Sequence, residues 1–72
     1  MPDAIATSIT LNGDPFPLHA ETNLTALLEQ LNVRRGRVAV EINRRIVPKA
    51  SYDTTIVRAG DDVEIINFVG GG

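Results

Sequence analysis

The fold is decided by residues 38–48, which read Val38-Ala39-Val40-Glu41-Ile42-Asn43-Arg44-Arg45-Ile46-Val47-Pro48. The first five residues alternate, with two valines and an isoleucine on one face, and this predicts a strand that is buried on one side. A polar turn follows at residues 43–45, and a second, short strand starts at Ile46-Val47 and stops at Pro48. The sequence on either side must therefore provide something for this strand to pack against.

A short helix is predicted immediately upstream, within residues 21–32. Its apolar side chains recur at i, i+3, i+4 and i+7, the spacing of one helical stripe. The four positions are Leu24, Leu27, Leu28 and Leu31. Thr22 or Asn23 can cap the first turn by accepting a backbone N–H hydrogen bond. Because the stripe covers only about two turns, the helix cannot persist alone and must be held by a sheet.

Further strands are predicted towards both ends of the chain. Residues 4–12 form the first strand, and Asn12-Gly13 favours a tight hairpin because a type I′ turn needs positive φ at both central residues. The return strand near Phe16 and Leu18 contains two prolines, which places it at a sheet edge. Downstream, residues 49–55 look irregular with Tyr52 as their anchor, and a turn at residues 59–62 leads into a last strand at 63–69. That strand is apolar at nearly every position, which suits the centre of a sheet.

One helix and one mixed sheet with a single buried face predict a two-layer α+β domain. We expect one domain over residues 1–72, with residues 69–72 as a flexible tail. A chain of 72 residues buries only about 60 % of the surface that its unfolded form exposes, so one thin core is all it can build.

Composition excludes several classes of protein. The chain has no cysteine, which rules out disulfides and thiolate metal sites, and we expect no metal centre. It has no apolar run long enough to span a membrane and no signal peptide, so we expect a cytoplasmic location and no membrane partner. Its net charge of −2 argues against nucleic acid as the main partner. The lone His19 and the paired Asp61 and Asp62 are interpreted as ordinary surface and turn residues.

Two features remain as candidates for function. Five arginines lie in the middle of the sequence, and two loops could bring them together as one basic face that docks an acidic partner or nucleic acid. They are Arg34, Arg35, Arg37, Arg44 and Arg45. A solvated rim that balances the nine acidic residues is the simpler interpretation, because no aromatic platform accompanies the charge.

The second feature is the run Gly70-Gly71-Gly72 directly after the last strand. Glycine packs nothing, so a stable domain gains little from three of them. As a narrow, extended segment they can enter a channel and reach roughly 10 Å, and they would deliver the α-carboxylate of Gly72. A frayed terminus is the alternative for such a tail.

The second half of the chain is similar to the ThiS family, the ubiquitin-like sulfur carriers of thiamin biosynthesis. The residues that carry the resemblance are the 38–48 stretch, the spacer with Tyr52, Ile56-Val57, Gly60-Asp61-Asp62 and the terminal Gly-Gly. The likeness covers roughly residues 8–72. It implies a β-grasp fold and a carrier that has no catalytic residues of its own.

The resemblance also implies a reaction and a set of partners. An E1-like adenylyltransferase (ThiF-like) would activate Gly72 with ATP, which the carrier itself does not bind. A cysteine desulfurase relay would supply sulfur, and the Gly72 thiocarboxylate would pass it to a thiazole synthase (ThiG-like). Gly70, Gly71 and Gly72 would enter the partner's active site. Ile66, Phe68 and Val69 are candidates for docking, with a place in the core as their alternative.

Three other functions stay open from the sequence. The small subunit of molybdopterin synthase shares the fold and the thiocarboxylate, and a ubiquitin-like modifier would instead conjugate Gly72 to lysines. A non-catalytic β-grasp binding module would work through Arg44 and Arg45 and would not need the terminal glycines.

Overall fold

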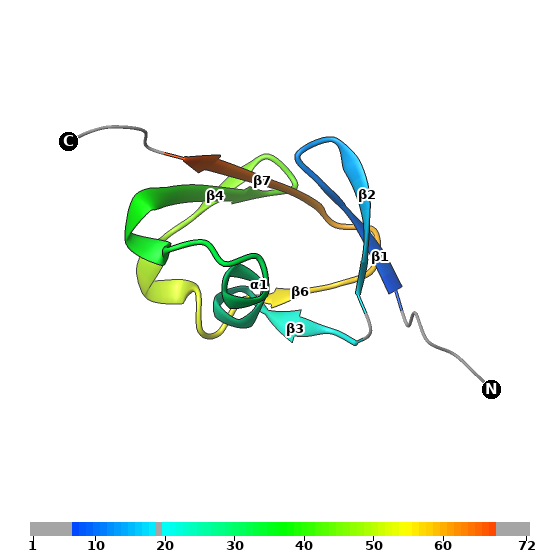
Figure 1. The fold of residues 1–72 in the computed structure, drawn as a ribbon, viewed down its shortest axis with the longest axis horizontal. Helices are drawn as coiled ribbons and strands as arrows, with labels where there is room; N and C mark the ends of the chain where they lie inside the picture. The colour runs from blue at the N-terminus through cyan, green and yellow to red at the C-terminus, as the bar shows by residue number, and fades with distance from the viewer. Residues whose placement is uncertain (1–6, 19, 68–72) are drawn as a thin grey trace.

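In the computed structural model, which describes residues 7–18 and 20–67, a five-stranded mixed sheet packs against one helix (Figure 1). The strands are β1 (Thr7–Leu11), β2 (Asp14–Leu18), β3 (Thr22–Asn23), β4 (Val38–Ile42), β5 (Arg45–Val47), β6 (Ile56–Val57) and β7 (Asp62–Asn67). The helix is α1 (Leu24–Gln30), and two short 3₁₀ turns are η1 (Arg35–Arg37) and η2 (Lys49–Ser51). The large sheet has the order β2-β1-β7-β4-β5. The predicted two-layer α+β architecture is confirmed.

The N-terminal hairpin forms as the sequence predicts. Leu11 pairs with Asp14 across a two-residue loop, and Asn12 and Gly13 both have positive φ, of 50° and 88°. Proline-containing β2 is the outermost strand on its side of the sheet. Asn12 also ties the hairpin to the centre of the sheet, because its Oδ1 accepts a 2.8 Å hydrogen bond from the Ile65 amide.

The helix is short and is capped at its first turn. The Oδ1 atom of Asn23 accepts a 2.7 Å hydrogen bond from the Ala26 amide. Of the two predicted candidates, Thr22 and Asn23, it is therefore Asn23 that caps the helix. The first three leucines of the stripe are buried, and Leu31, just beyond the last helical residue, packs against the core from its edge. Seven residues are too few for a stable isolated helix, so this contact with the sheet holds it.

The last strand occupies the centre of the sheet, as its apolar composition predicts. β7 runs parallel to β1 and antiparallel to β4. Only one of its faces is buried, however: Val63 and Ile65 point towards the helix, whereas Glu64 and Ile66 are exposed. The strand starts at Asp62, and its predicted last residues, Phe68 and Val69, lie outside the described residues.

A second, two-stranded sheet was not expected from the sequence. β3 pairs with β6 in antiparallel fashion, joining Thr22 to Val57 and Asn23 to Ile56. Two-residue strands have no periodicity that a sequence pattern could reveal. This small sheet fixes the start of α1, because the Leu24 amide donates a 2.9 Å hydrogen bond to the Thr55 carbonyl oxygen.

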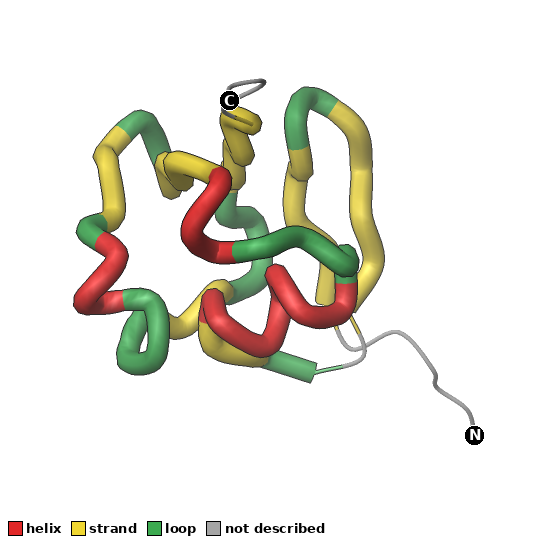
Figure 2. Tube along the Cα trace, turned by 60° about the vertical axis from the view of Figure 1, so that its left-hand side comes forward, coloured by secondary structure: helices red, strands yellow, loops and turns green. Residues whose placement is uncertain are grey.

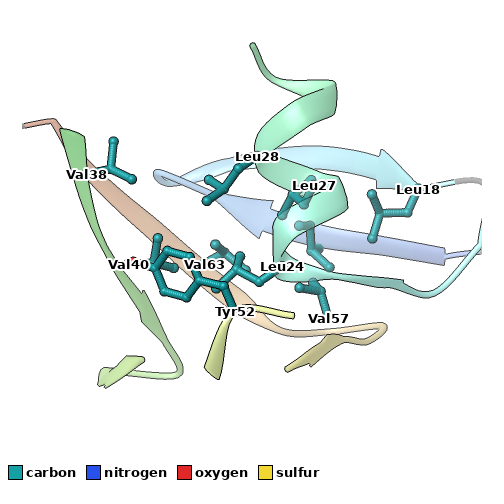
Figure 3. Packing of buried hydrophobic residues seen from close by; sticks show 10 residues of the cluster. Leu18, Leu24, Leu27, Leu28, Val38, Val40, Tyr52, Val57 and Val63 are labelled. Atoms are coloured by element: carbon teal, nitrogen blue, oxygen red, sulfur yellow. The ribbon is translucent and has the colours of Figure 1, made fainter. Parts of the chain in front are cut away.

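The core fills the space between α1 and the large sheet. Figure 3 shows its buried side chains pointing towards one another from the helix, from both halves of the sheet and from the loop after β5. They are Ile9, Leu18, Leu24, Leu27, Leu28, Val38, Val40, Tyr52, Val57 and Val63. Tyr52 is the anchor predicted for the irregular segment, with only 1 % of its surface exposed. Figure 2 shows the helix and the 3₁₀ turns in relation to the strands.

Candidate functional site

β7 carries the chain from the middle of the sheet to one end of it. Asn67, the last described residue of β7, pairs with Val38, the first residue of β4. The described part of β7 therefore ends beside the start of β4 and not at a sheet edge. Five of the predicted site residues lie outside the described residues, namely Phe68, Val69, Gly70, Gly71 and Gly72. The structure consequently defines the surface from which this segment starts.

Ile66 is the one docking candidate that the structure describes. Its side chain points away from the helix, on the outer face of the sheet, and is 47 % exposed. It pairs with Ala39 of β4, whose small side chain leaves it uncovered. The alternative place for Ile66, in the core, is excluded, because strand alternation gives the buried positions to Val63 and Ile65.

The outer face of the sheet combines apolar and acidic side chains. Ile46 on β5 is 73 % exposed and pairs with Glu41 on β4, which in turn pairs with Glu64 on β7. Ile46 was not singled out from the sequence. It lies on the three-residue strand β5 opposite Glu41 of β4, and a residue opposite a glutamate is expected on the outer face. Two like charges directly opposite one another on neighbouring strands destabilise the sheet. The stability of the sheet therefore does not explain why Glu41 and Glu64 face each other.

A shallow hollow lies on this outer face and is lined by Glu41, Arg44, Asp62 and Glu64. Among the described residues, no group of three His, Cys, Asp or Glu side chains is arranged to hold a metal ion. The neighbouring Asp61 has a structural part: its carboxylate accepts hydrogen bonds from the Arg58 amide (2.8 Å) and from the Asn43 side chain (3.0 Å). The turn interpretation of Asp61 is thus confirmed, whereas His19 lies outside the described residues.

The five arginines fall into two groups at the two ends of β4, so the possibility that two loops bring all of them together as one basic face is not realised. Arg34, Arg35 and Arg37 precede β4, and Arg44 and Arg45 follow it. A five-residue strand is about 17 Å long, and β4 therefore holds the two groups apart at its opposite ends. We call residues 34, 35 and 37 the tail-side arginines, because Asn67 lies at their end of β4, and residues 44 and 45 the turn arginines.

One tail-side arginine braces the fold. The Arg35 guanidinium lies 5.3 Å from the centre of the Tyr52 ring, 3.4 Å from Asp53 Oδ1, and donates a 2.8 Å hydrogen bond to the Lys49 carbonyl oxygen. It therefore joins η1 to η2. Burial raises the pKa of the Tyr52 hydroxyl, and the Arg35 charge opposes this shift. A hydrogen bond from the Thr25 hydroxyl, together with the Arg35 charge, lowers the pKa of the Asp53 carboxyl.

The described part of the chain contains no helix that is long and apolar enough to cross a membrane. What it presents is a compact support with an apolar and acidic outer face. Asn67 stands at one end of that face.

Comparison with known proteins gives a consistent result. The model of the ThiS family matches residues 9–72. The sulfur carrier protein ThiS of Escherichia coli is 33 % identical over 64 residues, which are 89 % of this chain and 97 % of that protein. The crystal structure of a thiamine biosynthesis protein (ThiS) from Geobacter metallireducens superposes with a TM-score of 0.80 at 36 % identity, covering 92 % of this chain and all of the other.

A longer protein also resembles the chain. A thiazole synthase from Paramagnetospirillum magneticum is 44 % identical over 64 residues, or 89 % of this chain. Those residues make up only 20 % of the thiazole synthase. The chain thus spans about a fifth of the length of this relative, and the likeness concerns that part of it.

Proposed function

The chain belongs to the ThiS family of sulfur carrier proteins of thiamine biosynthesis, and from this premise we propose that its working group is the carboxylate of Gly72. It has the β-grasp fold of that family and acts as a carrier, not as a catalyst. The observation that carries the proposal is the course of β7, a central strand whose last described residue, Asn67, lies at one end of the sheet, five residues before Gly72.

The proposed chemistry has three steps, each performed by a partner. A Gly72 carboxylate oxygen attacks the α-phosphorus of ATP, pyrophosphate leaves, and an acyl-adenylate forms. The terminal sulfur of a persulfide then attacks the carbonyl carbon, and AMP leaves. A thiol reduces the resulting acyl disulfide, which leaves the thiocarboxylate on Gly72. A carboxylate needs this activation because its oxygen is otherwise a poor leaving group.

The partners follow from these steps. An E1-like adenylyltransferase supplies the ATP site, and a cysteine desulfurase relay supplies the persulfide. A thiazole synthase receives the sulfur, and this choice is supported by a relative of that name that contains a stretch similar to this chain. Because the first step consumes ATP, we place the reaction in the cytoplasm.

Docking on these enzymes is assigned to the outer face of the sheet near Asn67. Ile66 provides exposed apolar surface only one residue before that point, and Phe68 and Val69 continue from there. A few well-packed side chains near the centre of an interface contribute most of its affinity. Gly70 and Gly71 would then lie in the channel that leads to the reacting atoms, where the absence of Cβ atoms permits a close approach.

Intact mass spectrometry tests the proposal. The chain is incubated with ATP, the cognate adenylyltransferase and a sulfur source, and a gain of about 16 Da is expected on the C-terminal fragment; the gain must be located on that fragment because oxidation of Met1 adds nearly the same mass. A matched chain with one residue added after Gly72 should gain nothing. Sulfur incorporation into that blocked chain, or none into the unmodified chain, would contradict the proposal.

A further inference from the structure

The tail-side arginines lie at the end of β4 at which the described part of β7 ends. η1 (Arg35–Arg37) is followed at once by Val38, and Val38 pairs with Asn67, the last described residue of β7. The turn arginines lie at the other end of the same strand, where Arg45 pairs with Ile42. The two groups are thus equal in chemistry and differ in their distance from the tail.

The charge of Arg34 and Arg37 is not used within the described part of the chain. Arg35 is held by Asp53, the Lys49 carbonyl oxygen and Tyr52, but Arg34 and Arg37 are exposed and form no ion pair with any described residue. The Arg37 amide donates a 2.9 Å hydrogen bond to the Arg34 carbonyl oxygen. This backbone hydrogen bond brings the main chains of the two arginines close together, so both charges belong to the same turn.

The turn arginines stand in a different electrostatic setting. Arg44 lines the hollow on the outer face together with Glu41, Asp62 and Glu64, so acidic side chains lie around it. Although the net charge of the chain is −2, its tail-side end of β4 carries the charges of Arg34 and Arg37 without an ion pair to any described acidic side chain. A local excess of one sign steers association with a surface of the opposite sign.

We propose that Arg34 and Arg37 dock on acidic side chains that rim the opening through which the adenylyltransferase admits the tail. This inference rests on the proposed function of Gly72. The five residue steps from Asn67 to Gly72 span at most about 18 Å when fully extended. With Gly72 at the reacting atoms and the tail extended, Asn67 and the two arginines lie near the mouth of the channel, away from the α-phosphate. Their contribution is to binding and not to the chemical step.

The test compares two charge-reversed chains. Arg34→Glu/Arg37→Glu changes the side next to the tail, and Arg44→Glu/Arg45→Glu is the matched control at the other end of β4. Each pair of substitutions lowers the net charge by four, from −2 to −6, so global charge cannot explain a difference between them. The readout is the adenylation rate as a function of carrier concentration, at low and at high salt.

For the tail-side variant we expect the KM for the carrier to rise roughly 10-fold or more at low salt, with kcat within about twofold of the unmodified chain. The control variant should change KM by less than about threefold. High salt should raise KM for the unmodified chain, because it screens an attraction, and should lower KM for the charge-reversed tail-side variant, because there it screens a repulsion. Should the reversed chain fold poorly, Arg34→Gln/Arg37→Gln removes the charge without reversing it and must show the same direction of change.

Several outcomes would overturn the inference. Equal KM values for the two variants would remove any special part for the tail-side pair, and a loss of kcat at constant KM would place the pair in the chemical step. Binding of a labelled single-stranded RNA that is lost in the tail-side variant, with KM for adenylation unchanged, would assign the pair to nucleic acid. If the unmodified chain itself gains no sulfur, the proposed function fails, and this inference fails with it. A sulfur gain with equal KM values overturns the inference alone.

Discussion

Asp53 accepts hydrogen bonds from two sides, from the Thr25 hydroxyl and from the Arg35 guanidinium. Both favour the ionised carboxylate, so the pKa of Asp53 in the folded chain lies below its ordinary value of 3.8. A lowered folded pKa stabilises the fold above the unfolded pKa, and this contribution is lost as the pH falls through the folded value. We therefore expect Asp53→Asn to lower the free energy of unfolding at neutral pH, with a deficit that shrinks below about pH 4. Urea unfolding at a series of pH values measures it, and a deficit that stays constant down to the most acidic point would contradict the assignment.

Ile66 and Ile56 are two half-exposed isoleucines in strands, with 47 % and 41 % of their surface accessible. Only Ile66 lies on β7 near Asn67, so only Ile66→Thr should weaken docking of the adenylyltransferase. A loss of about 1–2 kcal/mol, roughly a 5- to 30-fold rise in KM, is expected for a contact near the centre of an interface. Ile56→Thr removes the same apolar surface from β6 and should leave KM unchanged. Similar effects of the two substitutions would show that Ile66 has no specific part in docking.

At the scale of the elements, the β1–β2 and β4–β5 hairpins both have two-residue loops, and the loops differ only in their second residue. Asn12-Gly13 and Asn43-Arg44 both join their strands with positive φ at each position. Arginine at a φ of 70° carries a backbone strain that glycine avoids. We expect Arg44→Gly to raise the free energy of unfolding by about 0.5–1 kcal/mol, and Gly13→Ala to lower it by about 1 kcal/mol. No atom lies within 4 Å of a Cβ added at Gly13, so its cost is one of conformation. Chemical denaturation measures the free energy of unfolding of both variants. A change in the same direction for Arg44→Gly and Gly13→Ala would contradict this explanation.

These elements also show which parts of the structure a sequence pattern can reveal. The β1–β2 hairpin, the Asn23 cap, β4 and central β7 depend on local spacing or on turn residues, and each was predictable. The β3–β6 pair was not, since two residues have no period. The separation of the arginines was missed for another reason: neighbours in sequence lie at opposite ends of a strand, and only the pairing of β4 with β7 shows which group adjoins Asn67.

At the scale of the whole molecule, stability and the proposed function occupy separate parts of the chain. All ten described core side chains lie between Ile9 and Val63, whereas the proposed reaction takes place at Gly72. A domain of this size has a total stability of only about 4–11 kcal/mol, so a core substitution has a large relative effect. Leu27 belongs to α1 and is fully buried in the core. Its replacement by alanine should lower the free energy of unfolding by about 2–5 kcal/mol.

A pair of variants separates the two parts. A chain that lacks Gly71 and Gly72 should unfold within about 0.5 kcal/mol of the full chain, because glycine has no side chain to bury in the core. It should nevertheless gain no sulfur when incubated with ATP, the adenylyltransferase and a sulfur source. Leu27→Ala should show the opposite behaviour, with lowered stability and with sulfur transfer to the molecules that remain folded. Urea unfolding and intact mass measured on the same preparations give both quantities. If the free energy of unfolding of the shortened chain is lower by more than about 1 kcal/mol, the glycines support the fold. If the shortened chain still accepts sulfur, the reacting group lies elsewhere.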